Sequence, residues 1–165
     1  MDSNRYERPK TLHNDKNNLI ADCIVDGILH GMFAGSVMLA LFIGMGNLVG
    51  KSPLDLLSML GAPDTASSPM QGALRHIAMS AVYGIVWILL IVLPVRRWRF
   101  AHVYNWRLVG IGYGILLWLI ALIVIQYWTA LSLLPWYALL IAHMVYGGTL
   151  GYLQVRLKSL KQVSG

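Results

Sequence analysis

The sequence predicts an all-α integral membrane protein, a bundle of four transmembrane helices, from three observations. Of the 165 residues, 57% are hydrophobic and only 12% are charged, whereas soluble domains average about 45–50% apolar and about 25% charged residues. The apolar residues gather in four stretches, each long enough for the about 20 residues that a helix needs to cross a bilayer. The basic residues lie beside these stretches. We therefore expect a single membrane domain.

The transmembrane domain is expected over residues 19–158, after a polar cytoplasmic tail of residues 1–18. Its first helix is expected over residues 19–49. Asp22 and Asp26 fall where this helix enters the membrane, a depth at which carboxylates are tolerated. No short apolar run with a small-residue cleavage site precedes it, so we expect the helix to be retained and not removed as a signal peptide.

The link after the first helix predicts a short amphipathic helix on the outer surface. Ser52 suits the N-cap, Pro53 suits the first turn, and Gly61 is a suitable end. The apolar face expected for this helix consists of Leu54, Leu57 and Leu60.

Three further transmembrane helices follow in the sequence. The second is expected over residues 73–93 and should end at Pro94, where three arginines follow closely. The third is expected over residues 108–128. The fourth is expected over residues 135–157, with a proline in its first turn, and a cytoplasmic tail of residues 159–165 completes the chain.

The basic residues predict the orientation. Eleven of the 13 Lys and Arg residues belong to the N-terminal tail, the link between the second and third helices, and the C-terminal tail. Only Lys51 and Arg75 lie on the other side. Because Lys and Arg are retained on the cytoplasmic side, both termini should be cytoplasmic. Trp and Tyr residues cluster near both ends of the predicted helices, as aromatic belts do.

Small residues recur at steps of four in the predicted helices, and in two helices a histidine begins the series. Residues four apart lie on one helix face, and small residues let membrane helices approach closely. The main interpretation is a packing contact with a histidine, His76 or His143, at one end. The expected packing residues are Gly31, Gly35, Ser80, Gly84, Gly110, Gly114, Gly147 and Gly151. Because the pattern occurs in the second and fourth helices, it also suggests a tandem two-helix repeat.

The alternative interpretation makes the histidines ligands of a haem or metal, since neutral imidazole is a common ligand. His30 and His76 are expected at opposite ends of the membrane, roughly 25 Å apart along its normal, so they cannot share an ion. Only His76 and His143 form a conceivable pair, and their expected depths differ by several ångströms. We therefore expect no metal and no cofactor, with haem as the minor alternative.

A second polar group lies on the first helix. Asp22, Asp26 and His30 fall at steps of four and so share one face at the cytoplasmic entrance. Ionisable groups within the membrane are candidates for function, here proton or cation entry. The simpler interpretation is that the two carboxylates solvate the start of the helix and pair with nearby cations.

Other chemistry has little support in the sequence. Cys23 is the only cysteine, so there is no intrachain disulfide or thiolate cluster. No nucleophile elbow, phosphate-binding loop, HExxH or paired-carboxylate motif is present. The basic residues form no continuous face, and nucleic acid is not an expected partner. We expect a protein that is not an enzyme.

The motifs together resemble an uncharacterised family of small four-helix prokaryotic membrane proteins that is known only as a domain of unknown function. The motifs that carry the resemblance are Gly31-x-x-Ala34-Gly35-x-x-Met38, Met59-Leu60-Gly61, His76-x3-Ser80-x3-Gly84 and His143-x3-Gly147-x3-Gly151. Ser80 departs from the family, where glycine is more usual. The resemblance implies the four-helix architecture and the inner membrane of a prokaryote, and it implies no activity.

Three functions remain open at this stage. The first is a non-catalytic subunit or scaffold that packs within a larger membrane complex, such as a respiratory or photosynthetic one, with lipid and other membrane subunits or further copies of itself as partners. The alternative is a small oligomeric transporter or ion-permeation protein, and the third is a haem-binding electron carrier. A transporter needs polar groups that converge on a cavity, whereas a packing subunit does not.

Overall fold

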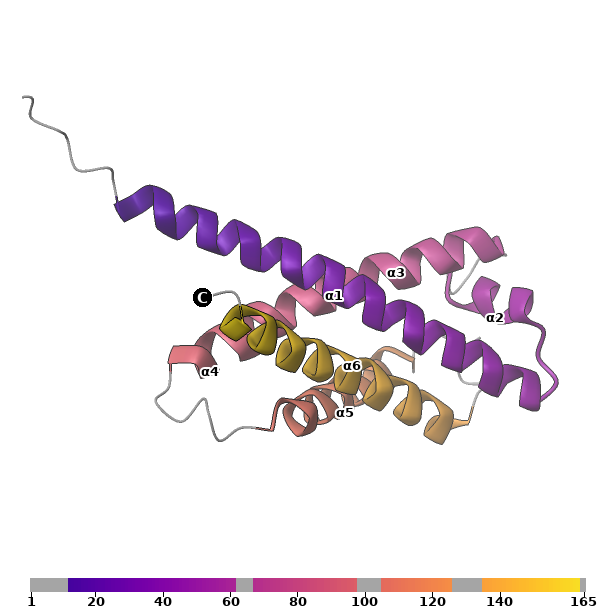
Figure 1. Cartoon of the computed structure of the whole chain (residues 1–165). Helices are drawn as coiled ribbons and strands as arrows, with labels where there is room; N and C mark the ends of the chain where they lie inside the picture. Colours follow the sequence, from indigo (N-terminus) through magenta and orange to yellow (C-terminus); the bar gives the residue numbers. More distant parts are fainter. Residues whose placement is uncertain (1–11, 62–66, 98–104, 126–134, 164–165) are drawn as a thin grey trace, which may run out of the picture.

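The computed structural model describes residues 12–61, 67–97, 105–125 and 135–163, and within these ranges every regular element is a helix. The elements are α1 (Leu12–Leu48), α2 (Pro53–Met59), α3 (Pro69–Val86), the π-helical segment η1 (Trp87–Val92), α4 (Leu93–Arg97), α5 (Trp106–Ile125) and α6 (Trp136–Val163), shown in Figure 1. Four apolar segments are long enough to cross a membrane: Ile20–Leu48, Pro69–Val95, Trp106–Ile123 and Trp136–Arg156. The predicted all-helical architecture with four potential membrane spans is confirmed, which suggests a multi-pass membrane protein.

The helices at both ends of the chain are longer than predicted. α1 begins at Leu12, so a large part of the expected tail is helical. This helix of 37 residues is roughly 55 Å long, well beyond the about 30 Å of a bilayer core. α6 continues to Val163, past the predicted end at residue 157. Mostly polar residues extend both helices, and an apolar pattern does not detect such extensions.

The predicted helix end at Pro94 is wrong, because the helical path continues to Arg97. A proline inside a helix lacks an N–H and collides with the carbonyl four residues earlier. Here the preceding residues form a π-helical turn, in which the Leu93 N–H donates to the carbonyl of Ile88, five residues back. The wider turn changes the hydrogen-bond register before the proline.

α2 has the predicted N-terminus but a different buried face. The Ser52 hydroxyl accepts a hydrogen bond of 3.1 Å from the Asp55 N–H, and Pro53 occupies the first turn. Leu54 was expected on the apolar face, yet it is 63% exposed, whereas Leu56 is fully buried. A 100° helix step places Leu56 away from Leu54, and Leu56 packs with Phe42.

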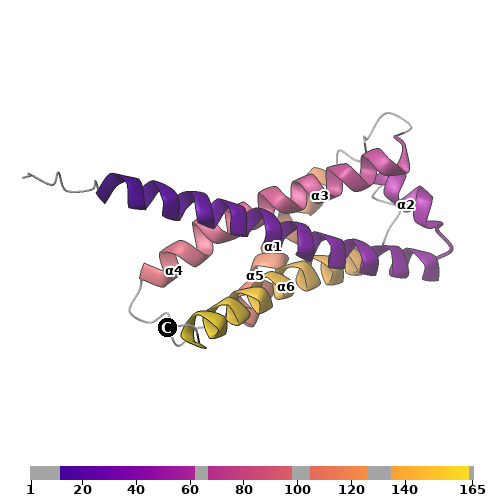
Figure 2. The same ribbon diagram turned by 45° about the horizontal axis from the view of Figure 1, so that its top comes forward.

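The long helices pack as two antiparallel pairs. We call α1 with α3 the first helix pair, and α5 with α6 the second helix pair. The two pairs meet mainly through α1 and α6 (Figures 1 and 2). Between them lies a core of large buried side chains, with Trp87, Tyr113, Tyr146 and Leu150 at its centre. In both views the N-terminal end of α1 projects clear of the other helices.

Candidate functional site: a cavity between the helix pairs

The first helix pair is in contact through the small residues that the sequence singled out. A Cβ added at Gly31 would collide with the backbone of α3 at Ser80 and Gly84, and a Cβ added at Gly35 would collide with the side chain of Ser80. Gly84 in turn lies against the backbone of α1 at Gly27 and Gly31. The absence of side chains therefore sets the distance between α1 and α3.

The second helix pair is in contact in the same way. A Cβ at Gly110 would collide with the backbone at Gly147, and a Cβ at Gly114 would collide with the carbonyl of His143. Gly151 lies against the backbone of Trp106. All eight residues expected to pack helices are thus at helix contacts.

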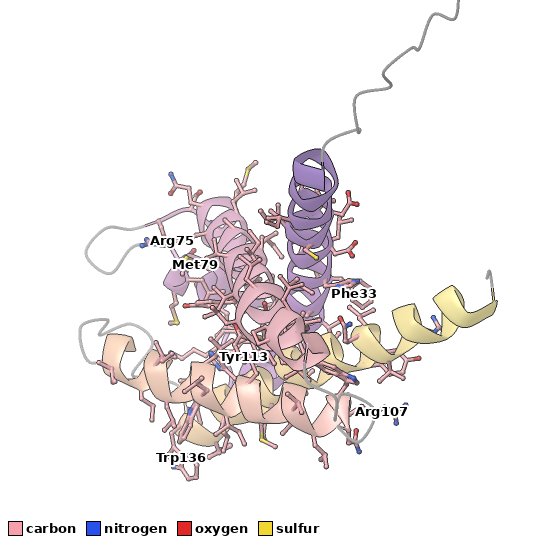
Figure 3. The ribbon with its side chains drawn as sticks, turned by 90° about the vertical axis from the view of Figure 1, so that its left-hand side faces the viewer. Phe33, Arg75, Met79, Arg107, Tyr113 and Trp136 are labelled. Carbon is pink, nitrogen blue, oxygen red and sulfur yellow. The ribbon has the colours of Figure 1, made fainter. Side chains whose placement is uncertain are left out.

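Two tyrosines from the second helix pair donate hydrogen bonds to α3. The Tyr146 hydroxyl donates to the carbonyl of Ser80 at 2.7 Å, and the Tyr113 hydroxyl donates to the carbonyl of Tyr83 at 2.8 Å. Figure 3 shows Tyr113 on α5 beside the α3 helix. These bonds fix the second helix pair against the first at the level of one turn of α3.

Next to these tyrosines lies a cavity of about 370 Å³. All four long helices line it, and Leu60 after α2 adds to its wall. The lining residues are Met38, Phe42, Leu60, Arg75, His76, Met79, Ser80, Tyr83, Leu117, Ala121, Leu139, His143 and Tyr146. Its size and mostly apolar wall with a few convergent polar groups are typical of small-molecule sites.

The structure brings His76 and His143 to this one cavity, so the expected difference in depth does not keep them apart. The two imidazoles are near enough to interact electrostatically. Each ring has one nitrogen engaged with a backbone carbonyl. Nε2 of His76 lies 3.1 Å from the carbonyl oxygen of Gly35 on α1, and Nδ1 of His143 lies 2.7 Å from the carbonyl oxygen of Leu139 on its own helix.

One positively charged side chain belongs to the cavity wall. Arg75 on α3 donates a hydrogen bond to the carbonyl of Gly61 and so connects α3 to the end of the α2 segment. Figure 3 shows Arg75 and Met79 together on α3. Among the described residues that line the cavity, none carries a carboxylate.

The proposed proton or cation entry group does not contribute to the cavity. Asp22 and Asp26 are exposed and His30 is half-buried, and these three side chains lie along α1 outside the cavity lining. Asp26 interacts electrostatically with His30. Because α1 begins at Leu12, Asp22 and Asp26 do not lie at the start of the helix, and the simpler interpretation is wrong on this point. The role in proton or cation entry stays a prediction.

The small residues that follow both histidines are covered by neighbouring helix backbone, so a haem could approach the imidazoles only from the cavity. The haem alternative stays a prediction. For metals, no group of three or more His, Cys, Asp or Glu side chains in the described part of the chain could hold an ion.

Several polar residues of the bundle were not among the site residues predicted from the sequence. Arg75 was assigned only to topology, although it adjoins His76, and Tyr146 was not assigned at all. Gln154 is fully buried, and its amide nitrogen and oxygen have no hydrogen-bond partner among the described residues. The spacing in the sequence could have identified Tyr146 and Gln154. Tyr146, Leu150 and Gln154 follow His143 at steps of three or four, which places them on nearly the same helix face.

No protein-family model, no curated protein and no solved structure matches this chain. The resemblance to a family of four-helix membrane proteins therefore stays a prediction.

Proposed function

We propose that this protein binds a small, largely apolar molecule in the cavity between its helix pairs and carries it within or across the membrane. One observation carries the proposal: His76 and His143, from different helix pairs, line the same cavity of about 370 Å³. A packing subunit needs no such convergence of polar groups. We propose no catalytic reaction.

The lining of the cavity favours a neutral ligand over a cation. No described lining residue offers a carboxylate to balance the charge of a bound cation. Burying an unpaired charge is costly. A pathway for protons or metal cations through this cavity is therefore less favoured than binding of an organic molecule.

Filling the cavity tests the proposal. Ala121 lines the cavity and Ala40 is exposed on α1, so Ala121→Trp should fill the site and Ala40→Trp should not. We expect small molecules extracted from the purified wild type and from Ala40→Trp to include a species that Ala121→Trp lacks, as measured by mass spectrometry. Identical extracts from the three folded proteins would contradict the proposal.

For the orientation, we propose that both termini are cytoplasmic, that α2 lies on the outer surface, and that the membrane is the inner membrane of a prokaryote. The distribution of Lys and Arg supports the first two statements, and the family resemblance supports the last. In a Cys23→Ser background, a cysteine replacing Ser67 should react with an impermeant reagent from outside. Reaction at a cysteine replacing Ser159 instead would invert this orientation.

A second candidate function is that of a subunit within a larger membrane complex. The observation that favours it is the N-terminal end of α1, which projects past the bundle and past its own apolar span from Ile20 (Figures 1 and 2). An isolated helical extension is marginal in water without a packing partner. Deleting residues 2–16 should weaken copurification of a partner and leave insertion intact. A deletion variant that retains every copurifying protein would rule out this role for the extension.

A further inference from the structure

We infer that the cavity selects a neutral aromatic molecule with hydroxyl donors, of the hydroquinone class. This inference rests on the proposed function and adds the chemical class of the ligand. It follows from the positions of the hydrogen atoms on the two imidazoles, from the lack of carboxylates in the described lining and from the aromatic side chains of the wall.

The hydrogen bonds of His143 and His76 determine which nitrogen carries a hydrogen in each neutral ring. A backbone carbonyl can only accept, so a ring nitrogen bonded to one must donate. Nδ1–H of His143 therefore donates to the carbonyl of Leu139, and Nε2–H of His76 donates to the carbonyl of Gly35. A neutral imidazole has one N–H. Nε2 of His143 and Nδ1 of His76 therefore carry no hydrogen, and each has a lone pair that can accept a hydrogen bond.

Two lone pairs on the walls of one cavity call for a ligand that donates. A quinone or an ether offers only acceptors and would leave both imidazole lone pairs unpaired in an apolar site, which is costly. A molecule with two O–H groups can satisfy both. A site discriminates between similar ligands in this way, because the wrong ligand leaves buried polar groups without partners.

The other lining residues narrow the class of donor. An ammonium ion would be buried in a mostly apolar cavity with no carboxylate among the described lining residues, which is costly. A neutral hydroxyl carries no such penalty. Phe42, Tyr83 and Tyr146 supply aromatic surface, against which a flat ring packs favourably. An aromatic diol with a lipid-soluble body donates to both lone pairs, brings no charge into the cavity and packs against its aromatic side chains.

The experiment compares two probes of nearly equal shape on the full-length protein in lipid nanodiscs. Trimethylhydroquinone has two O–H donors, and its dimethyl ether has none. Binding is measured by equilibrium dialysis, with empty nanodiscs subtracted to remove partition into lipid. We expect the wild type to bind the hydroquinone roughly tenfold more tightly than the ether, since each hydrogen bond contributes a few-fold.

Three variants locate the selectivity. His143→Ala and His76→Gln should each reduce the preference to roughly threefold, because one acceptor is lost or misplaced. His76→Gln keeps an N–H that can reach Gly35, so the contact of α1 with α3 is preserved. His30→Ala is the matched control, because His30 does not line the cavity, and it should keep the full preference.

The possible failures are distinguishable. Equal binding of both probes to the wild type, with both lost in Ala121→Trp, would overturn the donor requirement and leave the proposed function standing. Hydroquinone binding that persists in Ala121→Trp would place the site elsewhere and overturn both. Tight binding of Cu⁺ that excludes the hydroquinone and requires both histidines would show that the lone pairs bind a metal, and would also overturn the inference.

Discussion

The two helix pairs solve the same packing problem with similar residues and different hydrogen bonds. In the first helix pair, Gly31 lies against Ser80 and Gly84, and in the second, Gly110 lies against Gly147 and Gly151. A histidine precedes each pattern by one turn. The correspondence is what a tandem repeat would produce, and the repeat itself stays a prediction.

The difference between the pairs lies in the hydrogen bonds of the histidines and in Ser80. His76 reaches across the first helix pair to the carbonyl of Gly35, whereas His143 is bonded within α6. Ser80 has a side chain where Gly147 has none, and its hydroxyl donates back to the carbonyl of His76 at 2.8 Å. The first pair is thus joined by contact and a hydrogen bond, and the second by close backbone contact at its glycines. The second pair should depend more strongly on its glycines.

The largest effect is therefore expected from Gly147→Leu. A side chain at this position collides with the backbone of Gly110 and Gly114, which cannot move aside as a flexible side chain can. We expect a loss of about 3 kcal/mol or more in the free energy of unfolding, measured by reversible unfolding in detergent.

Gly112 provides the control for this change. It lies on α5 between Gly110 and Gly114, and a Cβ added there meets nothing within 4 Å. Gly112→Leu should therefore unfold like the wild type. Equal unfolding of Gly147→Leu and the wild type would show that the α5 and α6 backbones do not approach as described.

An intermediate effect is expected where the second helix pair is bonded to the first. Tyr146→Phe removes the 2.7 Å hydrogen bond to the carbonyl of Ser80 and keeps the ring. We expect a loss of about 1 kcal/mol, within the range found for hydrogen bonds between membrane helices. Tyr137→Phe, at an exposed position, should be neutral. A Tyr146→Phe protein as stable as the wild type would show that this hydrogen bond does not stabilise the contact between the two helix pairs.

The four spans and both packing contacts could be predicted because each rests on local spacing. Apolar length specifies a span, and glycines at steps of four specify a face of close approach. The register between helices is different, because it depends on two distant segments at once. The hydrogen bond from His76 to Gly35 joins residues 41 positions apart, and nothing local to either residue indicates it.

The cavity illustrates the same limit. His76 and His143 were identified as the only pair that could meet, but their depths were estimated from separate helices, without the contacts that hold the helix pairs together. Pro94 was expected to end a helix, but a π-helical turn precedes it, and this turn begins at Trp87, which is buried in the core. Such features follow from tertiary packing, so helix propensity and hydrophobic periodicity do not predict them.

The smallest effect, and the closest test of the comparison, is expected from the two histidines themselves. His76→Ala removes a bond between helices, and we expect it to cost about 0.6 kcal/mol, the average for such bonds in membranes. His143→Ala removes a bond to the carbonyl of Leu139, four residues earlier in its own helix. That carbonyl is also placed to accept a backbone N–H of α6, so no buried group should be left without a partner. Both residues line an existing cavity, so neither truncation should create a closed void of the kind that makes core substitutions severe.

We therefore expect the free energy of unfolding of His143→Ala to lie within about 0.3 kcal/mol of the wild type, and His76→Ala to be measurably less stable. The reverse order in paired unfolding curves would mean that His143, not His76, joins the helices, and the contrast between the two pairs would be lost.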